Sequence, residues 1–143
     1  MRKTIIALYG RANEGKSSTL INLYNLMGGE TTTNINDISI SLIYQDNKIA
    51  FISQSDPTEE IFETFEFDLR TFLTNNCKIV FVTSRTRGKI VHLIDELANE
   101  FNYNVIWLST SFSPHLNTTI LNDLHANYLL DLSNTLIFNQ NIH

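Results

Sequence analysis

Several sequence features that indicate particular classes of protein are scarce in this chain. It has one cysteine, Cys77, in 143 residues, so no disulfide can form within the chain. Ten Lys and Arg against 15 Asp and Glu give a formal net charge of −5, which provides no overall attraction for nucleic acid or an anionic membrane. No apolar run is long enough to cross a bilayer, and strand-like residues begin within the first few positions, which leaves no room for a signal peptide. We therefore expect a cytoplasmic protein that binds neither membrane nor nucleic acid.

Proline and glycine are also scarce, with two and five residues respectively. Disordered and linker-like chains are rich in both, whereas 43% of this chain is hydrophobic and 17% is charged. Its four histidines have no metal-binding spacing with Cys77 or with one another. These observations indicate one globular domain over residues 1–143.

Two of the five glycines belong to a recognisable motif. Residues 10–17 read G-R-A-N-E-G-K-S, which fits G-x-x-x-x-G-K-[ST] at every fixed position. The apolar run before it, 4–9, predicts a buried strand, and residues 18–27 have apolar side chains at helical spacing. A loop that joins a strand to a helix in this way presents backbone N–H groups to an anion at the positive end of the helix. The motif therefore predicts a phosphate-binding loop.

The side chains of this loop predict how a nucleotide is held. Lys16 can reach the β- and γ-phosphates, and the Ser17 hydroxyl can bind Mg²⁺. The predicted ligands are Mg²⁺ and a nucleoside triphosphate, ATP or GTP. The predicted nucleotide-binding residues are Gly10, Arg11, Ala12, Asn13, Glu14, Gly15, Lys16, Ser17 and Ser18.

The whole chain alternates strand-like and helix-like segments. Strands are predicted at 3–9, 38–45, 48–53, 78–83 and 103–109, and helices at 15–27, 57–75, 88–101 and 114–138. The segments 38–45 and 48–53 are joined by a short polar turn and predict an antiparallel hairpin at the sheet edge. The other strands are apolar and each is followed by a helix, which indicates a mostly parallel sheet covered on both faces. We expect an α/β fold, a three-layer α/β/α sandwich.

Ligands of such sheets bind beyond the carboxyl ends of the parallel strands. This rule selects four polar segments as candidates for the site: 10–18, 53–56, 83–89 and 109–111.

The chain resembles the P-loop NTPase superfamily, and the loop itself resembles G-R-P-N-V-G-K-S-T-L-x-N of the Era-like bacterial GTPases. That resemblance covers residues 10–22 and implies contacts from Lys16 to the β- and γ-phosphates, from Ser17 to Mg²⁺ and from Ser18 to the α-phosphate. Era-like GTPases carry D-x-x-G after the third strand and N-K-x-D, which reads guanine, after the next. Here the corresponding segments are 53–56 (S-Q-S-D) and 83–86 (T-S-R-T). Without N-K-x-D, ATP is favoured over GTP.

Asp56 has two interpretations. A carboxylate at the end of a strand can hold Mg²⁺ opposite the loop hydroxyl, and Asp56 is the first acid after the apolar run 49–52. Asp56 is also suited to be the N-cap of the helix predicted at 57–75, with Pro57 at its first position, and the two roles are compatible. Ser53 and Gln54, which lie closer to the strand, offer a way to orient a water molecule.

Arg85, Arg87 and Lys89 form the densest group of basic residues. At the carboxyl end of a strand, arginines can neutralise a phosphoryl group in transfer, grip an acceptor phosphate, or stack on a base. A solvated loop, or a loop paired with the acidic helix at 57–75, explains the same residues. The predicted catalytic set is Lys16, Asp56, Arg85 and Arg87.

The sequence thus predicts a Mg²⁺-dependent protein that binds a nucleoside triphosphate and acts as a slow ATPase or switch. A small nucleoside or nucleotide kinase and a non-hydrolysing regulatory subunit are the alternatives. The acidic face of 57–75 and the broad apolar face of 114–138 leave room for a protein partner or a homo-oligomer.

Overall fold

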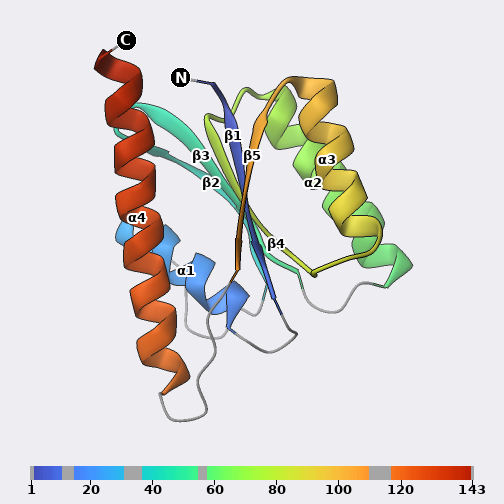
Figure 1. Cartoon of the computed structure of the whole chain (residues 1–143), viewed down its shortest axis with the longest axis horizontal. Coiled ribbons are helices and arrows are strands. Elements are labelled where there is room, and N and C mark those ends of the chain that lie inside the picture. The colour runs from blue at the N-terminus through green and yellow to red at the C-terminus, as the bar shows by residue number, and fades with distance from the viewer. Residues whose placement is uncertain (1, 11–14, 31–36, 55–57, 110–116, 143) are drawn as a thin grey trace.

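The computed structural model describes residues 2–10, 15–30, 37–54, 58–109 and 117–142 of the chain (Figure 1). Its strands are β1 (Thr4–Tyr9), β2 (Ser39–Tyr44), β3 (Asn47–Ile52), β4 (Ile79–Ser84) and β5 (Asn104–Ser109). Its helices are α1 (Lys16–Leu26), α2 (Glu59–Thr74), α3 (Lys89–Phe101) and α4 (Thr118–Ile142).

The five strands form one sheet in the order β2-β3-β4-β1-β5. Strand β2 is antiparallel to β3, and the pairs β3–β4, β4–β1 and β1–β5 are parallel. Helices α1 and α4 cover one face of the sheet, and α2 and α3 cover the other (Figure 1). The predicted α/β fold, with three layers and a mostly parallel sheet, is confirmed.

Alternation along the central strands produces two separate cores, one on each face of the sheet. In β1, Ile5 and Ala7 belong to the core beneath α2 and α3, whereas Ile6 and Leu8 belong to the core beneath α1 and α4. Because both faces are covered, the strand reads as a continuous apolar run, as expected for a buried parallel strand.

The hairpin of β2 and β3 is also confirmed. Gln45 and Asp46, the two turn residues, have φ angles of 49° and 66°, and positive φ at both central positions is the requirement of a type I′ turn. The pairing of Tyr44 with Asn47 places β2 at the edge of the sheet.

Two helices begin more than one residue later than predicted. Helix α2 begins at Glu59 and its N-cap is Thr58, whose hydroxyl accepts the N–H of Ile61 at 3.2 Å. Asp56 is therefore not the N-cap of this helix, and Asp56 itself lies outside the described residues. Helix α4 begins at Thr118 rather than at 114 and continues to Ile142 rather than to 138; the Asn117 side-chain oxygen accepts the N–H of Thr119 at 2.8 Å. Ser, Thr, Asp and Asn are all good N-caps, so sequence alone does not choose among neighbouring ones.

The sheet brings the candidate segments to one edge. In the strand register Tyr9 is level with both Ser84 and Ser109, so β1, β4 and β5 end together. Strand β4 lies between β3 and β1, and the segment that directly adjoins the end of β1 on that side is therefore the one that begins at Arg85. Within the described parts of the chain, the search for a helix with the length and hydropathy of a membrane span finds none.

At the opposite edge of the sheet, one buried hydrogen bond joins the starts of two strands. The hydroxyl of Tyr103, which precedes β5, donates to the backbone oxygen of Cys77, which precedes β4, at 2.5 Å. Tyr103 is 3% exposed, and burial raises the pKa of its hydroxyl.

We expect Tyr103→Phe to lower the free energy of unfolding by about 1–2 kcal/mol, because the Cys77 oxygen loses its buried donor. Urea denaturation measures the change. Tyr24→Phe is the matched control: Tyr24 is also buried and packs edge-to-face on Phe51, but its hydroxyl makes no hydrogen bond to a described residue. Equal losses in the two variants would contradict this account of the Tyr103 hydroxyl.

Candidate functional site

The predicted phosphate loop connects β1 to α1. Strand β1 ends at Tyr9, and Gly10 follows it; Arg11, Ala12, Asn13 and Glu14 lie outside the described residues. Gly15 is the N-cap of α1 and adopts the left-handed conformation, with φ 77° and ψ 20°. Glycine adopts this conformation without steric cost, and Lys16 then begins the helix.

Gly15 is also required by its neighbour on α4. A Cβ atom at this position would overlap the side-chain amide of Asn122. Helix α4 thus packs an amide directly on the start of α1, and any side chain at Gly15 would displace Asn122 as well as strain the backbone.

Lys16 connects the ends of two neighbouring strands. Its ammonium donates to the Gly10 backbone oxygen at 3.0 Å and to the Ser84 backbone oxygen at 2.8 Å. Gly10 follows β1 and Ser84 is the last residue of β4, so the cation lies at the carboxyl edge of the sheet. The positive end of the α1 dipole lies at the same place.

The two serines that follow Lys16 lie in the first turn of α1. Ser17 is half-buried, and Ser18 is exposed. The Ser17 hydroxyl has no hydrogen bond to any residue that the structure describes, so it is available to a ligand.

The end of β3 has a structural role. Ser53 is buried; its hydroxyl accepts the N–H of Ile38 at 2.9 Å, and its own N–H donates to the Ile38 oxygen at 2.8 Å. The N–H of Gln54 donates to the Thr83 hydroxyl at 3.2 Å, while the Gln54 side-chain oxygen is buried and has no hydrogen-bond partner among the described residues. Ser53 therefore closes the β2–β3 pair rather than facing a ligand.

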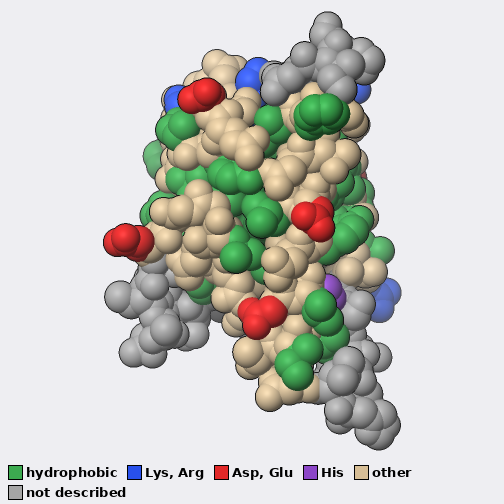
Figure 2. All heavy atoms as spheres, turned by 90° about the vertical axis from the view of Figure 1, so that its left-hand side faces the viewer, with side chains coloured by type: hydrophobic (Ala, Val, Ile, Leu, Met, Phe, Trp, Pro, Cys, Tyr) green, Lys and Arg blue, Asp and Glu red, His purple; other side chains and the backbone are tan. Residues whose placement is uncertain are grey.

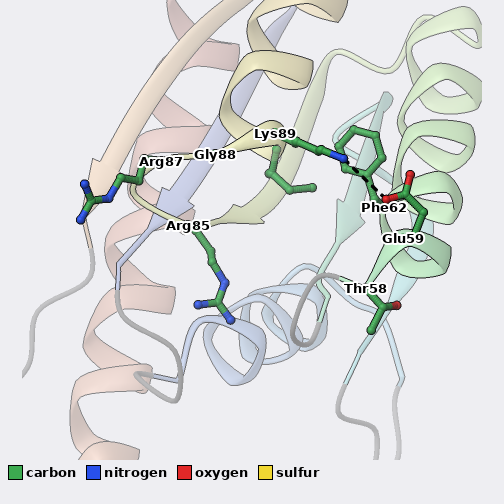
Figure 3. Close-up of a pocket in the computed structure, with 8 residues that line it drawn as sticks. Thr58, Glu59, Phe62, Arg85, Arg87, Gly88 and Lys89 are labelled. Carbon is green, nitrogen blue, oxygen red and sulfur yellow. Dashed lines mark ion pairs between the residues drawn. The ribbon is translucent and has the colours of Figure 1, made fainter.

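Arg85, Arg87 and Lys89 do not point to one place. Figure 3 shows Arg85 and Arg87 leaving the chain in different directions and Lys89 turned toward α2. The Lys89 ammonium lies 3.6 Å from the Glu59 carboxylate and 5.8 Å from the centre of the Phe62 ring. Together these side chains line a pocket of about 230 Å³ between the starts of α2 and α3. The prediction that this loop pairs with the acidic helix is thus confirmed for Lys89.

A second pocket, of about 380 Å³, lies at the carboxyl ends of β1 and β5, beneath α4. We call it the β5 hollow. The residues that line it include Leu8, Tyr9, Trp107, His125, Tyr128 and Leu129. The rings of Tyr9 and Trp107 meet edge-to-face, with centroids 6.2 Å apart. Burial lowers the pKa of His125 below its ordinary value of 6.5, which keeps the imidazole neutral at pH 7.

Sequence reasoning did not find the residues that α4 contributes. The sequence predicts His125 as a structural or surface residue and gives no role to Asn122. The prediction that Trp107 of β5 is a core residue is confirmed, because its side chain packs against the core beneath α2 and α3. The available signal is their spacing: Asn122, His125 and Leu129 recur at intervals of three and four, which places them on one face of a helix.

The comparisons with known proteins add little to this geometry. No protein-family model matches the chain, and no curated protein matches it. A solved crystal structure, that of APE1195, has a TM-score of 0.47 and 12% identity with this chain, covering 94% of this chain and 74% of that one. A similarity at this level carries no weight for function, so the residues of this chain alone support the assignment of the site.

Asn122 provides a test of the site's packing. It is 7% exposed, and its side-chain oxygen has no hydrogen-bond partner among the described residues. On the same helix, the Asn134 side-chain oxygen accepts the Tyr44 hydroxyl at 2.5 Å.

We expect Asn122→Leu to leave the free energy of unfolding unchanged or to raise it, because an unsatisfied buried amide is removed. Asn134→Leu should lower it by about 1–2 kcal/mol, because the Tyr44 hydroxyl loses its acceptor. Thermal and urea unfolding of both variants measure the difference. A loss at Asn122 as large as that at Asn134 would mean that the Asn122 amide is already satisfied in the free protein.

Proposed function

We propose that this chain binds a nucleoside triphosphate with Mg²⁺ and acts as a slow hydrolase or switch, with ATP favoured over GTP. One observation carries the proposal: at the G-x-x-x-x-G-K-S motif, Gly15 caps α1 in the left-handed conformation and Lys16 lies at the carboxyl ends of β1 and β4. The strand, the glycine, the helix start and the cation are thus arranged as a phosphate site requires.

The phosphates are bound by charge and by backbone dipoles. The first N–H groups of α1 have no acceptor within the helix, and the Lys16 ammonium adds a full positive charge beside them. Both favour the multiply charged triphosphate, and both favour still more the charge that develops when water attacks the γ-phosphorus and the bond to the β-phosphate oxygen breaks. Catalysis by such a site is positioning and charge neutralisation.

The residues at the start of α1 are also compatible with Mg²⁺. It binds few protein ligands and keeps several waters when it accompanies a nucleotide, so the Ser17 hydroxyl together with phosphate oxygens is a sufficient donor set. The described residues contain no cluster of three or more His, Cys, Asp or Glu that could hold a metal by itself. When bound, Mg²⁺ would neutralise phosphate charge; Asp56, the acid predicted to assist, lies outside the described residues.

Of the two arginines, Arg85 is the better candidate to neutralise phosphate charge. It directly follows Ser84, whose backbone oxygen accepts a hydrogen bond from the Lys16 ammonium. The backbone of Arg85 therefore lies next to that ammonium. Arg87 leaves the chain in another direction (Figure 3). A grip on one acceptor phosphate by both arginines, which the kinase alternative requires, has no support in this arrangement.

A protein partner remains part of the proposal. On α4 the side chains of Ile120, Leu124 and Tyr128 are 52%, 58% and 57% exposed and recur every fourth residue. Figure 2 shows hydrophobic side chains along the face that α4 forms. Such a stripe is suited to contact another protein or a second copy of this chain.

We expect Lys16→Ala to weaken the binding of Mg²⁺-ATP by at least about tenfold, because a charge-assisted hydrogen bond to phosphate is lost. Isothermal titration calorimetry measures the dissociation constants for ATP, GTP and inorganic tripolyphosphate.

Lys48→Ala is the matched control, because Lys48 lies in β3 at the amino edge of the central strands, where its ammonium donates to the Asn75 backbone oxygen at 3.4 Å. Circular dichroism verifies that both variants are folded. Titrations of Lys16→Ala that match those of the unaltered protein would remove the loop from the binding site.

A further inference from the structure

We propose that two copies of this chain associate through the free edge of β5. The two β5 strands would lie antiparallel about a two-fold axis and join the two sheets into one. This inference goes beyond the proposed function and does not depend on it, because the interface uses the edge of the sheet and needs no ligand.

The backbone of β5 has one unpaired edge. The strand is the last of the sheet and pairs with β1 alone among the described strands. The N–H of Asn104 donates to the Lys3 oxygen, beside β1, at 2.8 Å. Because successive residues of a strand direct their backbone groups to opposite edges, those of Val105, Trp107 and Ser109 face away from β1. Among the described residues these outward groups have no hydrogen-bond partner.

The side chains of β5 leave apolar surface on both sides of this edge. Val105 and Trp107 pack against the core beneath α2 and α3. Ile106 and Leu108 pack against the core beneath α1 and α4. All four are only partly buried, and Figure 1 shows the strand running between α4 and α3. Edge strands that avoid pairing carry charges, prolines or bulges, and β5 has none of these.

The distribution of charge selects a second copy as the partner. In a two-fold interface the same strand meets itself, so a charged side chain would lie close to a like charge. The segment 101–111 has no charged residue, although the chain carries a net charge of −5. The other edge strand, β2, has Asp37 and Asp46 just beyond its two ends. Antiparallel pairing of two β2 strands would bring these acids together, whereas two β5 strands meet without repulsion.

The three outward residues determine the register. A pairing that uses all of them places Trp107 opposite Trp107 of the second copy, on the two-fold axis. Val105 then lies opposite Ser109 of the second copy. Residues opposite each other in this way exchange both of their N–H···O bonds, and their side chains lie on the same face of the sheet. The two tryptophans are therefore neighbours in the dimer.

The surface available to the second copy extends beyond the strand. Leu108 and Ser109 line the β5 hollow together with Tyr128 of α4, which is 57% exposed. The apolar surface thus continues from β5 to the exposed side chains of α4. This continuity matters because a stable interface buries at least about 1,000 Å² in total, which a single pair of strands does not provide.

Sedimentation velocity tests the proposal. We expect the unaltered protein to form a dimer in the absence of nucleotide, with twice the 16.4 kDa mass of one chain. Val105→Pro should raise the dimer dissociation constant by about 10- to 100-fold, because two symmetry-related hydrogen bonds are lost. Its N–H faces the free edge, where proline is tolerated, so the pairing with β1 stays intact. Ser109→Pro removes the other outward N–H of the same pair and guards against a folding defect at Val105.

Ser41→Pro is the matched control on the other edge of the sheet. The Ile38 oxygen accepts the N–H of Ser53, which follows β3, so by alternation the N–H of Ser41 faces the free edge of β2. This variant should keep the dissociation constant of the unaltered protein. Circular dichroism verifies that each variant is folded. Trp107, the single tryptophan, gives a second reading: its emission should move to longer wavelength when dilution or Val105→Pro separates the copies.

The outcomes decide the inference. A monomer throughout the micromolar range would show that β5 does not pair with a second copy. A dimer that Val105→Pro and Ser109→Pro leave intact, or that Ser41→Pro weakens as strongly, would place the interface elsewhere and overturn the inference. Lys16→Ala should leave the dimer unchanged, so a failure of the proposed nucleotide site and a failure of this interface are distinguishable.

Discussion

The site depends on the pairing of β1 with a parallel strand on each side. All six residues of β1 pair with β4 on one side and with β5 on the other, and both faces of the strand are buried in separate cores. Its end cannot shift without breaking both ladders. The start of the proposed phosphate loop is therefore fixed. The two carbonyl oxygens that accept hydrogen bonds from Lys16 belong to Gly10, which follows β1, and to Ser84 of the neighbouring strand β4.

The same pairing gives the loop two unlike neighbours. Strand β4 continues into a basic segment, whereas the end of β5 borders a pocket that residues of α4 help to line. The basic segment that follows β4 and the pocket beside β5 thus lie on opposite sides of β1.

The sequence predicted those parts of the structure that local physics determines. The loop glycine, the hairpin turn at Gln45 and Asp46, and the alternation of strands and helices follow from backbone preferences and apolar periodicity. The start of α2 was not predicted, because Asp56 and Thr58 are both suitable caps and tertiary packing chooses between them. The placement of β4 beside β1 and of Asn122 against Gly15 depends on contacts between distant segments, which a single sequence does not reveal.

The central claim is that the 10–17 loop binds the phosphates of a nucleoside triphosphate. A crystal structure of the chain with Mg²⁺ and a non-hydrolysable ATP analogue tests it most directly. We expect phosphate oxygens within hydrogen-bonding distance of the Lys16 ammonium and of the first N–H groups of α1. Nucleotide bound away from this loop, with the Lys16 ammonium contacting no phosphate, would contradict the account.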